Sequence, residues 1–376
     1  MIKQRNVEHV RDRGNTGMSL IELLIGMGIM SLVMGGVFSA MTEAMRANET
    51  VKLSTGMNNN LRVAMDLIVR DMIQAGQGLP AGKVVSVPSG AGALPILRPG
   101  PIGETYTFNP AATALPAVSV GAGLGPVILG QPTDIVTVLA ADNVLNQVEI
   151  IDFTATSLRL SPDIDNADMP DLEGDNVRVG DLIMLTKGSI SALRLVTDVD
   201  GDELFFDEGD ALNLNQTGAE NGTLAQYVAA APADVAACPQ PPRACTFQIV
   251  PSVLTRVRMI SYYLETPGDD ERDLRLVRRI NANAPTVVAF FIEAFTLTYD
   301  LVDGVTNQVD VSMNGADLNG SGACAPAACS VNQIRKLNVV LTGRSAERHP
   351  QTRQFLRNTL ATQISLRNLA LVDRYS

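Results

Sequence analysis

The fold of this 376-residue chain is decided by residues 14–41, GNTGMSLIELLIGMGIMSLVMGGVFSAM. From Met18 to Met41 the residues are apolar or small, and the single ionisable side chain is that of Glu22. About 20 apolar residues, rising 1.5 Å each along a helix, cross the ~30 Å hydrocarbon core of a bilayer. A carboxylate in such a segment costs on the order of 2.5–3.5 kcal/mol at the bilayer centre. We therefore expect a membrane-spanning helix in which Glu22 has a partner.

The residues before the apolar run carry net positive charge, with four basic side chains against two acidic ones: Lys3, Arg5, Arg11 and Arg13 against Glu8 and Asp12. Positive residues next to a span stay on the cytoplasmic side, so the rest of the chain is expected outside. A secretory signal peptide is one alternative, but its apolar region is only 7–15 residues long and its cleavage site follows that region. A plain anchor is another, and it gives no reason for a glycine immediately before S-L-I-E.

The hexapeptide G-M-S-L-I-E, from Gly17 to Glu22, resembles the processing motif of type IV prepilins. The resemblance implies that residues 1–17 are a leader, that prepilin peptidase cuts after Gly17, and that Met18 becomes the N-methylated first residue. It also implies that Glu22 meets the amino terminus of a neighbouring subunit during assembly. A carboxylate and an ammonium group, each costly in hydrocarbon, offset one another when paired. Met18 departs from the family pattern, in which phenylalanine is usual.

The helix is expected to continue beyond the membrane, as a pilin helix over 18–76 with its membrane part at about 18–41. Apolar residues recur there at three- and four-residue steps, which is typical of an amphipathic helix. The stripe consists of Met57, Leu61, Ala64, Met65, Ile68 and Met72. Gly76, Gly78 and Pro80 are expected to end the helix. We expect this stripe to pack on the protein's own β-domain, while the membrane half stays free to bundle with other subunits.

The rest of the chain favours strands. Residues 77–133 are rich in Gly, Pro and Ala and show little periodicity, so no fold is assigned to them. Runs of β-branched residues bounded by turn formers predict strands at 134–140, 147–153, 177–188, 191–206, 256–265, 273–280, 287–301, 334–344 and 360–369. We therefore divide the chain into an irregular, β-rich insert region (77–245) and a β-sheet region (246–376). The predicted fold class is α+β and pilin-like, with a long helix packed on a large, mostly antiparallel β-domain.

The order of strands in the last third carries a second resemblance. The segments YYLE, DLRLVRRI, FIEAFTLTYDLVDG, IRKLNVVLTGRS and QISLRN, in this order, resemble the PilW-like minor pilins. They are also similar to the J-type minor pseudopilins of type II secretion. Both resemblances rest on strand patterns, whereas the prepilin motif is a chemical signature.

Four cysteines form two close pairs, Cys238 with Cys245 and Cys324 with Cys329. Outside the cytoplasmic membrane such pairs most simply close local disulfides, although the sequence leaves three connectivities open. Zinc is the competing interpretation. Neither spacing is C-x-x-C, and the only histidines are His9 and His349.

One acidic cluster has the composition of a calcium loop. Asp198, Asp200 and Asp202 alternate around Gly201, and Asp207 follows. Hard oxygen ligands around a glycine turn are what calcium sites use, but no bidentate Glu stands at the twelfth position of an EF-hand loop. The alternative is a solvated hairpin turn, because Asp and Gly are ordinary turn residues. Calcium is the one cofactor that we consider, and otherwise we expect none.

No catalytic constellation is found, so we expect no enzymatic activity. The chain lacks G-x-S-x-G, H-E-x-x-H and a phosphate-binding glycine loop. A net charge of −11, without a dense basic run, argues against nucleic acid as a partner.

Taken together, these resemblances imply a minor type IV pilin at an initiating or tip complex. Its partners would be other pilins, prepilin peptidase and the inner membrane, from which a periplasmic domain passes to the pilus or cell surface. The alternatives are a type II secretion minor pseudopilin and a pilus-tip adhesin that binds a surface, DNA or a glycan through residues 77–245. An anchored hydrolase is the third alternative.

Overall fold

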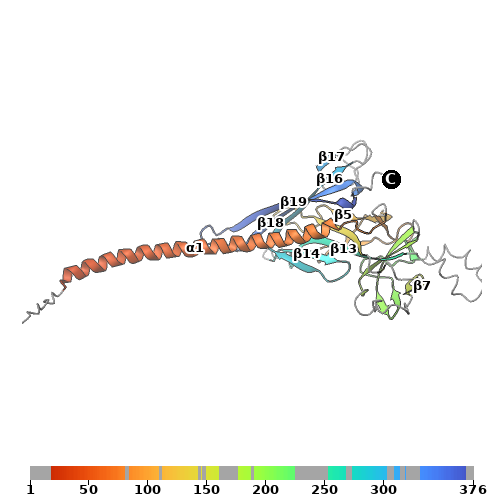
Figure 1. Cartoon of the computed structure of the whole chain (residues 1–376), viewed down its shortest axis with the longest axis horizontal. Helices are drawn as coiled ribbons and strands as arrows, with labels where there is room; N and C mark the ends of the chain where they lie inside the picture. Colours follow the sequence, from red (N-terminus) through yellow and green to blue (C-terminus); the bar gives the residue numbers. More distant parts are fainter. Residues whose placement is uncertain are drawn as a thin grey trace, which may run out of the picture.

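The structure is a computed structural model that describes residues 18–80, 84–109, 112–142, 145, 150–160, 177–187, 190–224, 253–267, 273–302, 309–313, 318 and 331–369. One long helix, α1 (Leu20–Ile73), is followed by a mostly antiparallel β-domain that packs along its second half (Figure 1). This architecture confirms the predicted α+β, pilin-like fold class.

Helix α1 spans 54 residues, which is about 80 Å at 1.5 Å per residue. Its end coincides with the predicted stop: Gln74 caps the helix, and Gly76 and Gly78 then adopt φ of 75° and 67°. Positive φ is easily reached only by glycine, so the chain turns away here. The six apolar residues of the predicted stripe, Met57, Leu61, Ala64, Met65, Ile68 and Met72, are all buried. The stripe therefore packs on the protein's own sheets, as its periodicity predicted.

The central sheet has seven strands within the described residues. They are β5 (Val118–Gly121), β6 (Ile135–Asp142), β9 (Leu182–Lys187), β10 (Ile190–Leu195), β13 (Val253–Glu265), β14 (Arg275–Ile280) and β15 (Thr286–Phe290). Strand β13 is its axis, because it pairs antiparallel with β6, β9 and β14. Strands from both sides of residue 245 thus share one sheet, which joins the insert region to the sheet region.

A second sheet has the order β17-β16-β18-β19. Its strands are β16 (Ile292–Val302), β17 (Val309–Met313), β18 (Ile334–Arg348) and β19 (Phe355–Ser365), and the short helices η4 (Val331–Gln333) and η5 (Arg367–Leu369) flank the last two. The β18–β19 hairpin lies along α1. A Cβ at Gly343 would be 3.1 Å from Leu61 Cδ2, so the missing side chain lets strand and helix approach closely.

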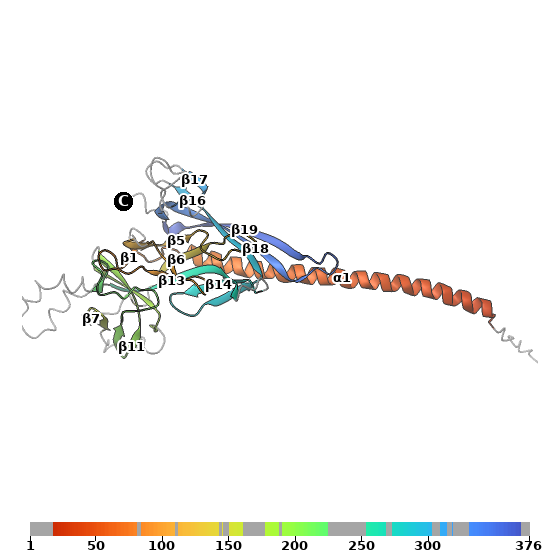
Figure 2. The same cartoon turned by 180° about the vertical axis from the view of Figure 1, so that it is seen from behind.

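A smaller sheet, β11-β12-β8-β7, forms a lobe at the end of the molecule opposite the free end of α1 (Figure 2). Its strands are β7 (Ile150–Phe153), β8 (Ser157–Leu160), β11 (Asp198–Asp200) and β12 (Glu203–Phe205). Strand β9 connects the two cores, because Leu182 and Met184 face the main core while Ile183 and Leu185 face the lobe. Two short pairs complete the described part, β1 (Val84–Ser86) with β4 (Ala114–Pro116) and β2 (Leu97–Arg98) with β3 (Tyr106–Thr107).

Two segments that were each predicted to be one continuous strand are interrupted in the structure. The strand expected over 287–301 is broken at Phe291, whose φ is 60°, and its halves β15 and β16 belong to different sheets. The strand expected over 191–206 is three strands, β10, β11 and β12, because the chain turns at Gly201 (φ 60°) and leaves the central sheet before β11.

A buried carboxylate, Asp71, fixes the end of α1 on the central sheet. The Tyr262 hydroxyl donates to its Oδ2 at 2.6 Å, and Arg278 Nε donates to the same oxygen at 2.5 Å. Burial, together with the hydrogen bond to Asp71, raises the pKa of Tyr262, so its hydroxyl stays protonated as a donor. Because β13 and β14 each supply one partner, the contact sets both the rotation and the axial position of the helix.

Replacing Asp71 by alanine should lower the free energy of unfolding by about 3 kcal/mol, because it leaves Arg278 without its partner in a largely buried place. The matched control is Asp66→Ala on the same helix, whose side chain is exposed and whose loss should change stability by less than about 0.5 kcal/mol. Urea unfolding of the full chain in detergent, followed by circular dichroism, measures both. Equal midpoints for the two variants would contradict this role of Asp71.

Candidate processing and assembly site

The first turn of α1 is closed by a reciprocal pair of hydrogen bonds between Ser19 and Glu22. The Glu22 backbone N–H donates to Ser19 Oγ at 3.3 Å, and the Ser19 backbone N–H donates to Glu22 Oε2 at 3.0 Å. This capping box satisfies two backbone donors that a helix start leaves free. It also places the Glu22 carboxylate against the positive end of the helix dipole. The carboxylate therefore has an internal partner within the single chain.

Met18 and Ser19 precede the helix. Ser19 has extended backbone angles, φ −72° and ψ 148°, and Met18 is 74 % exposed. The expected cleavage position is thus followed by two residues outside the hydrogen-bonded helix. Gly17, the residue after which cleavage is expected, and the rest of the predicted leader lie outside the described residues.

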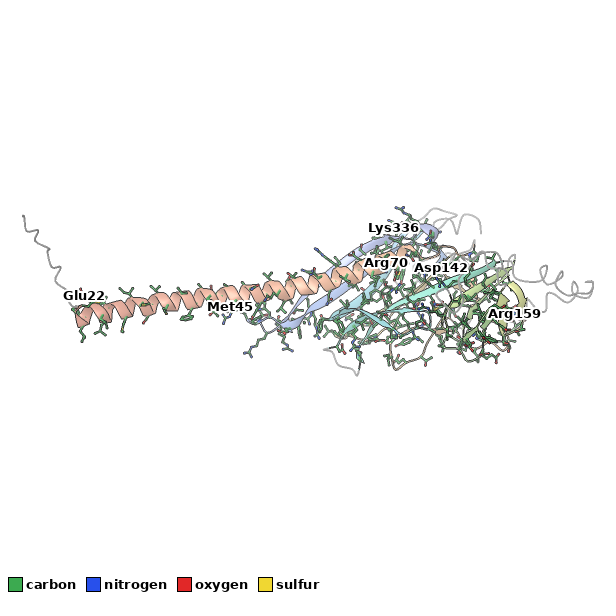
Figure 3. All side chains as sticks on the ribbon, turned by 60° about the horizontal axis from the view of Figure 1, so that its bottom comes forward. Glu22, Met45, Arg70, Asp142, Arg159 and Lys336 are labelled. Atoms are coloured by element: carbon green, nitrogen blue, oxygen red, sulfur yellow. The ribbon has the colours of Figure 1, made fainter. Side chains whose placement is uncertain are left out.

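The first half of α1 touches no other part of the described structure. Figure 3 shows the helix from Glu22 to Met45 standing clear of the β-domain. The segment is long and apolar enough to cross a membrane, and none of its most apolar window is buried. Large side chains such as Leu32 (79 %) and Phe38 (65 %) are exposed. Contiguous apolar surface of this kind marks a membrane or protein contact.

Two hydroxyl groups along this free half are satisfied within the helix. Ser31 Oγ donates to the Met27 carbonyl at 2.8 Å, and Thr42 Oγ1 donates to the Phe38 carbonyl at 2.8 Å. A polar group in hydrocarbon must find its partner inside the protein, and these hydroxyls do so. Glu22 is then the one charged group of the apolar segment, and it has the capping contact just described.

The predicted calcium residues lie on and after the β11–β12 hairpin, which turns at Gly201. Asp202 Oδ2 accepts from Arg159 Nε at 3.0 Å, while Asp207 Oδ2 accepts from Thr197 Oγ1 at 3.4 Å. Within the described residues, no group of three or more His, Cys, Asp or Glu side chains is arranged to hold a metal ion. Calcium binding by Asp198, Asp200, Asp202 and Asp207 stays a prediction. The four predicted disulfide residues, Cys238, Cys245, Cys324 and Cys329, lie outside the described residues.

Comparison with known proteins supports the class that this helix defines. Residues 12–38 match the family model of the prokaryotic N-terminal methylation motif. The match supports a type IV pilin-like or pseudopilin-like protein, and it implies processing by prepilin peptidase and assembly with other pilins. Together with the apolar helix, it fits membrane anchoring and a place on the pilus surface. No curated protein and no solved structure matches the chain.

Glu22 was among the residues expected at this site, whereas Ser19 was not. The signal was present: Ser or Thr followed three residues later by an acidic residue, just before an apolar run, is the signature of a capping box. Ser19-Leu20-Ile21-Glu22 has that pattern. Ser19 therefore joins Gly17, Met18 and Glu22 as a residue of the candidate site.

Replacing Ser19 by alanine should weaken the first turn of α1 by about 1 kcal/mol, because the Glu22 N–H loses its acceptor. Amide hydrogen exchange of residues 20–23, measured on the full chain in detergent, should become about fivefold faster. Ser31→Ala is the matched control, since it removes the same hydroxyl from the middle of the same helix. Unchanged protection at residues 20–23 in Ser19→Ala would refute the capping role.

Proposed function

We propose that this protein is a minor type IV pilin, a structural and assembly subunit inserted through α1. The observation that carries the proposal is the free apolar half of α1, which bears a prepilin-type motif at its start and ends where the β-domain begins. Such a surface has to be covered, first by lipid in the stored subunit and then by neighbouring helices in the filament. Four glycines on this half, Gly26, Gly28, Gly35 and Gly36, would let a neighbouring helix approach closely. Apart from the adjacent residues and backbone of α1 itself, no atom lies within 4 Å of a Cβ built at any of them.

A place at an initiating or tip complex is supported by the bulk of the β-domain. The β7–β8–β11–β12 lobe widens the molecule at the end away from the membrane helix (Figure 1). A bulky outer domain is easier to accommodate once at a tip than at every repeat of a dense shaft. The PilW-like order of strands points the same way. A type II secretion minor pseudopilin remains the alternative within the same class, and gene neighbours distinguish the two.

A tip adhesin is the alternative from another class, with residues 77–245 as its binding region. Binding of cells, DNA or glycans that is lost when β7, β8, β11 and β12 are deleted would favour it. We propose no catalysis by this chain. His349, the histidine in the described part, holds the end of a hairpin: its Nδ1 accepts from the Gln351 and Thr352 amides, each at 3.3 Å.

Processing predicts a defined mature terminus. Mass spectrometry of the chain purified from its native membrane should find Met18 as the first residue, carrying one added methyl group. Gly17→Leu should leave the chain uncut, whereas Gly14→Leu in the same leader should be processed normally. An intact leader in the unaltered chain, or a cut beyond the apolar run, would contradict the proposal.

Assembly should depend on the charge of Glu22 rather than on its hydrogen bonding alone. We expect Glu22→Ala and Glu22→Gln to insert into the membrane normally, and their amount in sheared filaments to fall at least about tenfold. Removing one partner of a buried ion pair costs about 3–5 kcal/mol, because the other charge is left unpaired, and a tenfold loss needs only ~1.4 kcal/mol. Glu43→Gln, the next carboxylate along α1, is the control and should assemble normally. Recovery of Glu22→Ala in filaments at the normal level would remove the assembly role.

A further inference from the structure

The part of the β-domain nearest the membrane helix is the tip of the β18–β19 hairpin. Three contacts fix the register of this hairpin along α1. Asn368 Nδ2 donates to the Ile73 carbonyl at 3.3 Å, Asn358 Nδ2 donates to Asn58 Oδ1 at 2.7 Å, and His349 Nε2 lies 2.9 Å from Thr50 Oγ1. The hairpin thus runs toward the N-terminal end of α1 (Figures 1 and 2). Its contact with Thr50 shows how far along the helix it reaches.

The tip is a closed loop that is joined to the helix by the hydrogen bond between His349 and Thr50. Its loop is closed by the His349 N–H donating to the Gln354 carbonyl at 2.8 Å and the Arg353 N–H donating to the His349 carbonyl at 2.9 Å. Since Thr50 Oγ1 already donates to the Arg46 carbonyl at 3.0 Å, it accepts from His349 Nε2. The imidazole is therefore in the tautomer with the proton on Nε2, and its Nδ1 accepts from the loop amides. Movement of the loop away from α1 would break the hydrogen bond between His349 and Thr50.

Two arginines at this tip have no carboxylate partner among the described residues. Arg344 and Arg357 share Glu293, at 3.7 Å and 2.6 Å. Arg348 and Arg353 are exposed, and neither forms an ion pair in the described part of the chain. Arg348 instead lies over the Phe355 ring, 5.2 Å from its centroid. Glu347, also exposed at this tip, offsets one of these charges, so Arg348, Arg353 and Glu347 together give the tip a net positive charge in a chain of net charge −11.

The height of the tip above the apolar segment matches a bilayer surface. From Met41 to Thr50 the helix rises about 13 Å. A headgroup layer occupies roughly 5–8 Å on each side of the hydrocarbon, and the screening length at physiological salt is about 8 Å. Arginine side chains at the level of Thr50 therefore reach the field of an anionic surface. At this level α1 carries two acidic and two basic residues, Glu43, Arg46, Glu49 and Lys52, whose charges sum to zero. The hairpin therefore determines the sign of the local charge.

We propose that Arg348 and Arg353 bind the headgroups of anionic phospholipids while the subunit is stored in the membrane. The inference rests on the proposed function, because it requires α1 to span the bilayer before assembly. The contact holds the β-domain against the outer leaflet and orients α1 relative to the membrane. Extraction into a filament then breaks it, because the tip leaves the surface as the helix rises.

Because the sequence contains no tryptophan, a single introduced tryptophan is a site-specific fluorescence probe. Gln351→Trp places a single tryptophan at the exposed loop, and the full chain is reconstituted in vesicles of phosphatidylcholine with or without phosphatidylglycerol. Nitroxide-headgroup lipid then quenches the tryptophan fluorescence according to its contact with the surface. We expect stronger quenching with phosphatidylglycerol, and loss of that difference at about 1 M salt, where the screening length falls to ~3 Å.

The double variant Arg348→Gln with Arg353→Gln is made in the Gln351→Trp chain. The equilibrium constant for contact between the tip and the anionic surface should fall about fivefold for each arginine removed. Lys336→Gln with Arg367→Gln is the matched control, because both residues are exposed and lie at the other end of the hairpin (Lys336 in Figure 3).

Equal quenching in the two lipids, or no effect of the double arginine variant, would overturn the proposal. Quenching that changes with subunit density and not with lipid charge would assign the tip to a neighbouring subunit instead. Extraction of the chain by alkaline carbonate would refute membrane storage itself, and with it the proposed function.

Discussion

Helix α1 is one continuous helix in two different surroundings: its first half is free of the β-domain, and its second half packs on it. The rest of the structure depends on how the second half is held in place. Its first half exposes apolar side chains on all sides, whereas its second half buries the apolar stripe from Met57 to Met72. Apolar packing alone is non-directional, so it leaves the rotation of the docked half poorly defined. Asp71, bonded to Tyr262 and Arg278, removes that freedom. This buried contact orients α1 on the central sheet, and the contacts of the β18–β19 hairpin with Asn58 and Thr50 set the height of the hairpin tip along the helix.

Features encoded in neighbouring residues were predictable from the sequence. The stripe on α1 and its stop at Gly76 depend on local periodicity and on glycine, and both are confirmed. The break at Phe291 was not predictable, because a phenylalanine at positive φ goes against its intrinsic preference and is held by its surroundings. The partners of Asp71 were not predictable either, since they lie 191 and 207 residues away in sequence. Tertiary contacts, rather than propensity, decide such positions.

The candidate site residues also divide into those that were predictable from neighbouring residues and those that depend on distant contacts. Gly17, Met18 and Glu22 are recognisable because the motif is contiguous, and the Ser19 cap was readable from the S-x-x-E spacing although it was overlooked. The acidic hairpin is different. Composition suggested a calcium loop, but Asp202 pairs with Arg159, 43 residues earlier. Which carboxylates are free to bind a metal depends on cations that distant strands bring to them, and a single sequence does not show that pairing.

The capping box gives a physical account of how one carboxylate serves both the stored and the assembled subunit. In the single chain, the Ser19 N–H satisfies Glu22 Oε2 at 3.0 Å, so the carboxylate does not enter lipid without a partner. That donor is neutral, whereas an ammonium group carries a full positive charge, and the attraction between opposite charges is strong where the dielectric constant is low. A neighbouring terminal ammonium, as the proposed function requires, therefore displaces the internal donor with a net gain. The Ser19 N–H is left at a helix terminus, where an unpaired donor is least costly and where the second carboxylate oxygen can still reach it. Under the proposed function, storage and assembly would therefore differ by an exchange of partners at Glu22.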